Sequence, residues 1–359
     1  MRISIWISIL TAMVAVVPAS SSGEVPHHAV VLIYHHVDTD TPASTSLSPE
    51  LFAEHLDYLV DHDYRALPLT ALVDSLRVGG AIPDRTVAFT FDDGYRSVYT
   101  EAFPRLRQLG WPFTVFVCSD ALDHGRGPVM TWEQLREMAA SGATVANHGK
   151  FHNHLQRRAE GESDQAWRSR TKAELLEAQG RIEEEIGSAP GLFAYPYGEA
   201  DEDLRELITE LGWVAFGQNS GPMGGASDLT MLPRFPMAGP FAAMKTFPDK
   251  VGSLPLPVLE VRPVDSLLTL EGAGKGQGPP LRLTLGPGDY RSGQLAAFAS
   301  GQGSADIEWI DSEAGILEVR ARNALPTGRS RYNITAPATD GLRYYWYSHT
   351  WIVGQSHKD

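Results

Sequence analysis

Cysteine is almost absent from this chain of 359 residues, which contains only Cys118. A single cysteine cannot form a disulfide within the chain, so the fold must depend on its core and on any bound metal rather than on covalent cross-links. Because Cys118 ends an apolar run over 113–118, we interpret it as a small buried apolar residue rather than a catalytic thiol.

The sequence also lacks a cluster of basic residues. It contains 30 Lys and Arg residues against 44 Asp and Glu residues, which gives a formal net charge of −14. Proteins that bind nucleic acid neutralise phosphates with a basic patch, so we expect no nucleic-acid partner. A neutral or partly cationic glycan is electrostatically acceptable to such a surface.

Long hydrophobic runs are missing except over 3–17, which follows Arg2 and precedes small residues over 18–23. A charged start, an apolar run and small residues are typical of a secretory signal peptide, with cleavage near 20–23. The run is short for a bilayer span, so we expect a secreted or periplasmic protein without stable membrane insertion. An uncleaved membrane anchor is the alternative, and the lack of cysteine here excludes a lipoprotein anchor.

Hydrophobic runs alternate with amphipathic segments through the first two thirds of the chain. Such repetition of strand and helix favours a parallel sheet, closed or nearly closed into a barrel. The expected strands are 29–34, 86–91, 113–118, 143–146, 192–195 and 214–217, and the expected helices are 48–61, 69–78, 99–109, 131–141, 165–186 and 201–211.

The pattern changes from about residue 236, where proline and glycine become frequent. Short alternating runs then predict a small all-β sandwich of about 100 residues. The expected strands are 258–261, 281–285, 295–299, 307–310, 316–321, 332–336 and 344–353. Aromatic residues in the last of these runs suit strand packing as well as sugar binding, so the sequence does not indicate a role for this region.

These patterns divide the chain into four parts. We expect a signal peptide over 1–23, an α/β domain over 24–240, a linker over 241–257 and a β-sandwich-like domain over 258–359. The sequence does not indicate the oligomeric state.

Two adjacent carboxylates, Asp92 and Asp93, follow the strand expected over 86–91 and precede Gly94. Neighbouring strand residues point to opposite faces, so both carboxylates can serve one site only where the strand ends and the backbone turns. Active sites of α/β enzymes lie at such strand ends.

Two imidazoles, His148 and His152, follow the strand expected over 143–146. The carboxyl ends of parallel strands meet at one mouth, so we expect these rings to approach the two aspartates. One aspartate and two histidines make a three-ligand metal site with positions open for water. Zinc suits this set, and so do cobalt, nickel and iron.

Three motifs together resemble those of the polysaccharide deacetylases that contain a NodB homology domain. They match in order and spacing over roughly residues 28–240: Thr90-Phe91-Asp92-Asp93-Gly94, His148-x-x-x-His152 and Phe193-Ala194-Tyr195-Pro196-Tyr197-Gly198. The resemblance implies a distorted (β/α) barrel of the NodB type, here followed by a small C-terminal all-β domain. It also implies a metal-dependent hydrolase that removes N-acetyl groups from polysaccharide containing N-acetylglucosamine.

The resemblance assigns roles to particular residues. Asp93, His148 and His152 bind the metal, Asp92 is the general base, and the backbone N–H of Tyr197 stabilises the oxyanion. We expect four further residues to contact the substrate, namely Tyr95, Tyr195, Pro196 and Trp213.

Two departures from the family pattern leave roles to be filled. Ala194 stands where the family has an arginine that pairs with the catalytic aspartate, and Arg234 is our candidate to supply that charge, with a purely structural arginine as the alternative. The Leu-x-x-His motif that provides the general acid is absent. His35 is our first candidate for this acid, ahead of His36, unless it only forms hydrogen bonds near the metal site or in the core. His154 is a third candidate, for which a solvated side chain is the favoured alternative.

The chain is most similar to a subgroup that de-N-acetylates exported poly-β-1,6-N-acetylglucosamine, because it shares a Tyr34-His35 pair, the Tyr-Pro-Tyr-Gly motif and a weak fifth motif. The short β region departs from the larger second domain of some members. Peptidoglycan, chitin oligomers and O-acetylated sugars are therefore alternative substrates. A catalytically silent carbohydrate-binding protein and an envelope adhesion protein are the alternatives from other classes.

Overall fold

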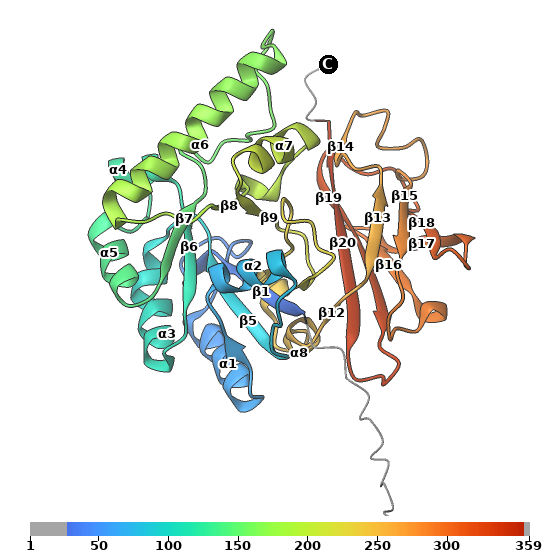
Figure 1. Ribbon diagram of the computed structural model, residues 1–359, viewed down its shortest axis with the longest axis horizontal. Helices are drawn as coiled ribbons and strands as arrows, with labels where there is room; N and C mark the ends of the chain where they lie inside the picture. The colour runs from blue at the N-terminus through green and yellow to red at the C-terminus, as the bar shows by residue number, and fades with distance from the viewer. Residues whose placement is uncertain (1–26, 355–359) are drawn as a thin grey trace, which may run out of the picture.

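The computed structural model describes residues 27–354, so the expected signal peptide over 1–23 lies outside the described residues. Within this range an α/β barrel lies beside an all-β region (Figure 1). No helix in the described part of the chain combines the length and the hydrophobicity that crossing a bilayer requires.

Six parallel strands form most of the barrel wall, in the order β1, β5, β6, β7, β8 and β9. Their bounds are His28–Tyr34, Thr86–Phe91, Phe113–Val117, Thr144–Asn147, Leu192–Ala194 and Val214–Phe216. The sequence predicted all six, because each is an apolar run whose residues are almost entirely buried. The fold expected from the resemblance, a distorted barrel followed by a sheet-rich C-terminal region, is confirmed.

The segment over 232–236 joins the two edges of this wall. Leu232 forms a parallel bridge to Phe216 of β9, and β11 (Phe235–Pro236) pairs in parallel with β1. On the other side of β1, β5 continues the sheet. The wall is thereby brought around on itself, which places residues near 234 beside β1 and β9.

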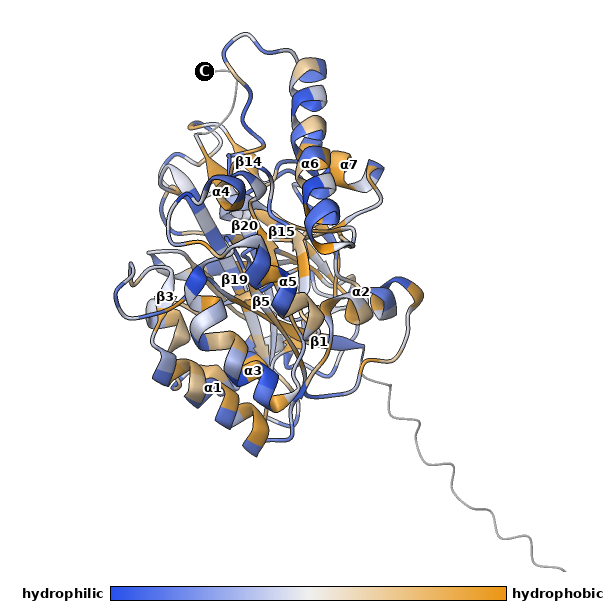
Figure 2. Cartoon of the chain, turned by 90° about the vertical axis from the view of Figure 1, so that its left-hand side faces the viewer, coloured by the Kyte–Doolittle hydropathy of each residue, from blue (hydrophilic) through white to orange (hydrophobic). Residues whose placement is uncertain are grey.

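Helices cover the outside of the barrel (Figure 1). Side-chain caps begin several of them: Ser48 at α1, Thr131 at α5, Ser163 at α6 and Asp201 at α7. The helices are α1 Pro49–Asp61, α2 Leu69–Val78, α3 Phe103–Leu109, α4 Ser119–His124, α5 Trp132–Ala140, α6 Asp164–Ile186, α7 Glu202–Glu210 and α8 Phe247–Val251. Figure 2 shows mostly hydrophilic outer surfaces on α5 and α6, as expected for helices that pack one face on a sheet.

Alternate residues of the strands face opposite sides of the wall. Ala88, Phe116 and Ala146 belong to one buried cluster drawn from all the strands, which is the barrel interior. Their neighbours Phe89 and Val115 belong to a second cluster that packs against α1, α3 and α5. Residues two or four positions beyond an interior residue therefore point into the mouth of the barrel.

The second sheet has nine strands around one buried cluster, and its main order is β12-β20-β19-β16-β17-β18-β15-β13, with β14 paired to β20. Their bounds are β12 Leu254–Pro255, β13 Val258–Arg262, β14 Leu267–Leu268, β15 Leu281–Leu285, β16 Ala296–Ala299, β17 Gly303–Asp311, β18 Ile316–Arg320, β19 Gly328–Pro337 and β20 Tyr344–Val353. The start of β17 pairs with β16 and its remainder pairs with β18, so one long strand connects the two halves of the sheet.

The segment over 241–257, expected to be a linker, is packed against both parts. Phe247 and Val251 of α8 are buried in the cluster beneath the barrel helices, and β12 pairs with β20. The two buried apolar side chains of this short helix, Phe247 and Val251, account for the packing. The proline and glycine content of the segment did not indicate it.

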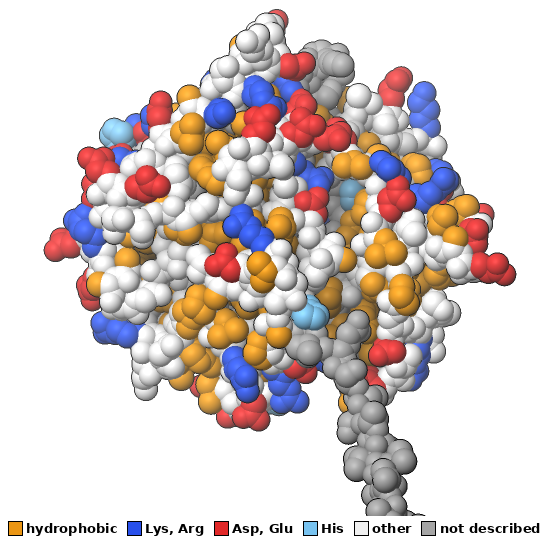
Figure 3. All heavy atoms as spheres, in the orientation of Figure 1, with side chains coloured by type: hydrophobic (Ala, Val, Ile, Leu, Met, Phe, Trp, Pro, Cys, Tyr) orange, Lys and Arg blue, Asp and Glu red, His pale blue; other side chains and the backbone are white. Residues whose placement is uncertain are grey.

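The barrel and the β region contact each other directly. Trp346 of β20 packs edge-on against Phe235 at a ring separation of 5.1 Å. Arg329 of β19 donates from Nη1 to Oε1 of Gln218, just after β9, at 2.9 Å. On the face drawn in Figure 3, basic and acidic side chains are intermixed rather than gathered by sign.

Candidate active site

Four buried side chains reach the mouth of the barrel from four segments of its wall. They are Asp92 after β5, Cys118 after β6, His148 after β7 and Arg234 in the closing segment. Each lies two or four positions beyond an interior residue: Ala88, Phe116, Ala146 and Leu232. Strand alternation alone therefore directs all four toward one point.

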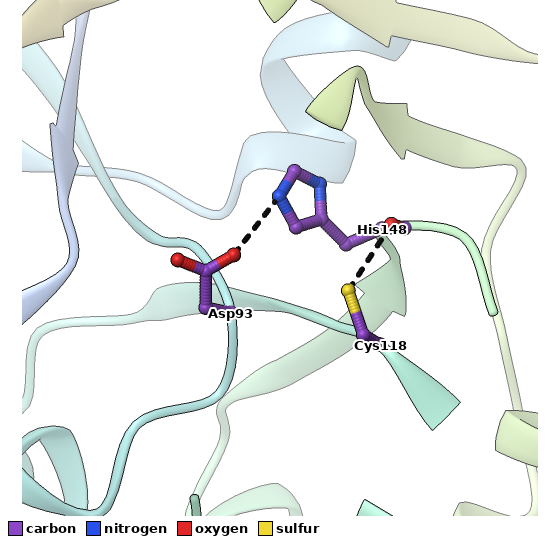
Figure 4. Close-up of side chains that lie close together, drawn as sticks. All are labelled: Asp93, Cys118 and His148. Carbon is purple, nitrogen blue, oxygen red and sulfur yellow. Dashed lines mark hydrogen bonds and ion pairs between the residues drawn. The ribbon is translucent and has the colours of Figure 1, made fainter. Parts of the chain in front are cut away.

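Asp93 reaches the same point because the backbone turns there. Its φ is 70°, a left-handed conformation that ends the strand and brings a second carboxylate to the mouth. Oδ1 of Asp93 lies 3.3 Å from Nε2 of His148 and 3.2 Å from Nε2 of His152. Figure 4 shows the Asp93 carboxylate facing the His148 ring.

The orientation of the His148 ring is fixed by a backbone carbonyl group. Its Nδ1 donates to the carbonyl oxygen of Ala194 at 2.7 Å, since a carbonyl can only accept, and this leaves Nε2 directed at Asp93. Burial lowers the pKa of His148, but the carboxylates of Asp92 and Asp93 outweigh it, so its pKa lies above the ordinary value of 6.5.

The donor atoms at this point fit a divalent metal. Within the described chain, Oδ1 of Asp93 and Nε2 of His148 are buried and have no hydrogen-bond partner, although they face each other. Buried polar atoms without partners are costly, and lone pairs that converge are satisfied by a cation. An oxygen and two imidazole nitrogens are ligands that zinc accepts.

Cys118 is a neighbour of the site that the sequence interpretation missed. It is buried, as expected, but its Sγ, a carboxylate oxygen of Asp93 and a ring nitrogen of His148 lie within 4.8 Å of one another. The thiol donates to the carbonyl oxygen of His148 at 3.3 Å, and burial raises its pKa well above the usual range. A protonated thiol is a poor ligand, so we favour His152 as the third ligand. The signal available in the sequence for Cys118 was its position two residues beyond Phe116.

Asp92 is held by Arg234 in a fully buried pair. Nη1 and Nη2 of Arg234 donate to the two carboxylate oxygens at 2.7 and 2.8 Å. Nε of Arg234 donates to the carbonyl oxygen of Gly217 at 2.9 Å, which fixes the guanidinium. Burial raises the pKa of Asp92, but the Arg234 charge outweighs it and the net pKa is lowered. Asp92 is therefore ionised at neutral pH.

The third motif forms a tight turn after β8. Tyr197 has a φ of 59°, and its ring lies over the site, 4.4 Å from the His152 ring and 4.0 Å from the His154 ring. Tyr195 and Pro196 are buried, and the Tyr195 hydroxyl donates to the carbonyl oxygen of Thr230. Tyr195 supports the turn from the core instead of facing the mouth, because it is one position out of phase with the interior residue Ala194. Pro196, two positions beyond Ala194, is in phase with the residues that point toward the mouth.

The remaining candidates are divided between the two ends of the barrel. His35 follows β1 at the mouth and is half-buried; burial lowers its pKa, against the opposing effect of Asp93 and Asp92. Tyr95 lies just past the two aspartates and stacks on His36 at 3.5 Å.

Trp213 is not brought to the site. It immediately precedes β9, at the end of the strand opposite the mouth, and packs near Phe193 in the cluster beside α7. The sequence identified a tryptophan near a strand but not the strand end to which it belongs.

Comparison with known proteins shows what the barrel part of the chain is similar to. The polysaccharide deacetylase family profile matches residues 79–216. The poly-β-1,6-N-acetyl-D-glucosamine N-deacetylase of Escherichia coli strain K12 is 26% identical over 245 residues, which cover 58% of this chain and 36% of that protein. The protein of the same name from Staphylococcus aureus strain MRSA252 is 22% identical over 184 residues, covering 50% of this chain and 63% of that protein. The chain thus spans less than two thirds of either relative.

Solved structures share the fold of the barrel. IcaB from Ammonifex degensii is 26% identical with a TM-score of 0.53, covering 63% of this chain and 96% of that chain. The deacetylase domain of BpsB from Bordetella bronchiseptica is 25% identical with a TM-score of 0.51, covering 58% and 95%. PplD from Streptococcus pyogenes, at 21% identity and a TM-score of 0.54, supports the fold alone, covering 60% and 94%.

Proposed function

We propose that this protein removes N-acetyl groups from a polysaccharide containing N-acetylglucosamine, with poly-β-1,6-N-acetylglucosamine as the favoured substrate. The match of residues 79–216 to the polysaccharide deacetylase family profile supports this proposal. The observation that carries the proposal is the convergence of Asp93 with His148 and His152 beside the buried pair of Asp92 and Arg234. The names of the E. coli and S. aureus relatives favour the β-1,6 linkage.

In this proposal Asp93, His148 and His152 hold a divalent metal, and zinc suits their donor atoms. When bound, such an ion polarises a carbonyl and lowers the pKa of water. The chain's own groups do the rest of the chemistry. Asp92 accepts a proton from the attacking water, and Arg234 keeps Asp92 ionised until it does so.

The other two roles belong to Tyr197 and His35. The backbone N–H of Tyr197 donates to the oxyanion that forms as the amide carbonyl becomes tetrahedral. Asp92 passes the proton gained from water to His35, and His35 delivers it to the leaving nitrogen as the C–N bond breaks, which releases acetate and an amine. Because the pKa of His35 is lowered, this histidine begins the cycle neutral and must first receive that proton. Tyr95 lines the mouth and contacts the sugar.

We also propose that the chain is exported by a signal peptide over 1–23 and is secreted or periplasmic. The barrel domain over 24–240 carries the reaction, and the region over 258–359 forms the small β domain. The three-part pattern of the first residues supports export.

Acetate release from purified protein tests the proposal. Oligomers of β-1,6- and β-1,4-linked N-acetylglucosamine are supplied in parallel, with and without a chelator, followed by zinc restoration. We expect chelator-sensitive release that is faster on the β-1,6 oligomer and falls about 10²- to 10⁴-fold in Asp92→Asn, the range for loss of a general base.

Other outcomes redirect the assignment. Faster release from the β-1,4 oligomer would point to chitin-type substrate. Zinc binding without acetate from either oligomer would exclude both linkages and turn attention to peptidoglycan, O-acetylated sugars and simple glycan binding. Release that is unchanged in Asp92→Asn would overturn the assignment of the base.

A further inference from the structure

Two non-glycine residues at the mouth have left-handed backbones. Tyr197 in the third-motif turn has a φ of 59°, and His152 has a φ of 56°. Such a conformation is strained for a residue with a side chain and persists only where the surroundings impose it. The two rings touch edge to face at 4.4 Å, so the strained turns support each other.

A third ring, that of His154, packs against Tyr197. The imidazole of His154 lies nearly parallel to the Tyr197 ring, at 4.0 Å and 14°. Tyr197 therefore has His154 on its face and His152 at an edge-to-face contact. Both the stacked and the edge-to-face arrangement are favourable contacts between aromatic rings.

The His154 ring is in turn fixed by a buried carboxylate. Nδ1 of His154 lies 2.6 Å from Oε2 of Glu199, whose side chain is 5% exposed. The same Oε2 accepts a hydrogen bond from Nε2 of the fully buried Gln156 at 2.8 Å. Short bonds to a carboxylate in a low-dielectric setting are strong and directional.

The pair of His154 and Glu199 connects the two loops that carry the proposed chemistry. His154 lies two residues after His152 in the loop after β7, and Glu199 lies two residues after Tyr197 in the turn after β8. From the sequence, His154 was a third candidate for the general acid or, more favoured, a solvated side chain, and Glu199 was not singled out. Neither role explains why the ring stacks on Tyr197.

We propose that His154 and Glu199 are positioning residues that fix Tyr197 relative to His152, and so aim the Tyr197 N–H at the reacting carbonyl. The inference rests on the proposed deacetylase function. The pair acts through the stacked ring and does not touch the reacting atoms.

Three variants separate stacking from hydrogen bonding. His154→Ala removes the ring, His154→Phe keeps a ring that can stack but loses the bond to Glu199, and Glu199→Gln keeps the size of the side chain but loses its charge. His62→Ala is the matched control, because His62 is an exposed histidine at the C-terminal end of α1 whose side chain hydrogen-bonds to the carbonyl oxygen of Tyr58 in its own helix. For each, kcat and KM for acetate release, zinc content and the urea midpoint are measured.

We expect His154→Ala to lower kcat about 10- to 100-fold, as misplacement of a catalytic group does, with KM and zinc content unchanged. His154→Phe should recover most of that loss, and Glu199→Gln should fall between the two. An unchanged kcat in His154→Ala, or a loss of kcat in proportion to zinc, would overturn the proposal. Equal losses in His154→Phe and His154→Ala would also overturn it, because the imidazole itself would then be needed.

A crystal structure of His154→Ala distinguishes this inference from the proposed function. We expect the Tyr197 backbone to leave the left-handed region once the ring is gone. If the wild-type protein releases no acetate, the proposed function fails while this structural outcome still stands. If Tyr197 keeps its conformation in the variant, the positioning role is wrong whatever the substrate.

Discussion

Asp92 and Arg234 form an ion pair whose side chains are both fully buried. An intact buried pair of this kind contributes little to the free energy of unfolding, because desolvation of both charges offsets their attraction. Removing one partner is different, since the other charge is then stranded in the interior. The ionised state of Asp92, the proposed base, and the stability of the barrel mouth therefore both depend on Arg234.

Replacing the arginine tests this coupling. We expect Arg234→Met to lower the free energy of unfolding by about 3–5 kcal/mol, because Asp92 is left buried without a cation. The double variant Asp92→Asn/Arg234→Met should lose less than the sum of the single variants, as measured by urea unfolding. Arg322→Ala, which breaks an exposed pair with Asp306, is the control and should change stability by at most about 1 kcal/mol. Strict additivity in the cycle would contradict the coupling.

Protons should compete with metal at His148. Its pKa is raised above 6.5 in the metal-free protein by Asp92 and Asp93, which outweigh burial, and a protonated imidazole cannot ligate. Zinc affinity should therefore fall as pH decreases, and the fall should begin above pH 6.5. Titrations with a competing chelator from pH 5 to pH 8 measure this. An affinity independent of pH over this interval would show that His148 is not a ligand.

At the scale of elements, the tight turn after β8 is the most constrained piece of the site. Gly198 has a φ of 67°, and an added Cβ would lie 2.7 Å from Cβ of Gln218. Gln218 is itself held by Arg329 of the β region. The turn is thus confined by Gln218 at Gly198 as well as by the His154 ring at Tyr197.

Gly198→Ala should disturb this turn. We expect a loss of stability greater than the roughly 1–2 kcal/mol of a left-handed alanine alone, together with a fall in acetate release, because the Tyr197 N–H moves. Gly187→Ala at the end of α6 is the matched control: its φ is 85° and nothing lies within 4 Å of the added Cβ. The control should show only the conformational cost and keep full activity. Differential scanning calorimetry and the acetate assay give both readouts, and equal effects in the two variants would contradict the prediction.

The elements that the sequence predicted are those with long apolar runs or complete motifs. The six barrel strands, the aspartate pair and the two histidines after β7 were all identified this way. The short helices α4 and α8 and the two-residue strands β12 and β14 were missed, because a helical or strand period cannot be detected over so few residues. Strand alternation could have placed Cys118 inside the mouth and Tyr195 outside it, but only once the interior residues of neighbouring strands were known.

At the scale of the whole molecule, the β region is part of the support of the barrel. Trp346 lies against Phe235, which belongs to β11 next to β1. Removing the region over 258–359 would expose this contact and the buried apolar residues around it. Truncation is therefore a poor test of whether the β region serves adhesion, since loss of activity could reflect loss of the barrel.

A point substitution separates these effects. We expect Trp346→Ala to lower the free energy of unfolding by about 2–3 kcal/mol, less than the roughly 3–5 kcal/mol for a core aromatic side chain, because Trp346 is only partly buried. In the wild type, the barrel and the β region should unfold in a single transition. Urea unfolding monitored by both fluorescence and circular dichroism measures this. Arg343→Ala, which removes an exposed pair with Asp84 across the same interface, should cost at most about 1 kcal/mol. Two separated wild-type transitions would show that the interface is weak.

The closing segment has a consequence for the order of assembly. Asp92 and Arg234 lie 142 positions apart in the chain, whereas the proposed metal ligands all precede β8. Contacts of such long range form late, because loop closure must be completed before they stabilise anything. In a refolding chain, the metal-binding groups should therefore come together before Arg234 pairs with Asp92. Zinc uptake should then precede the appearance of activity.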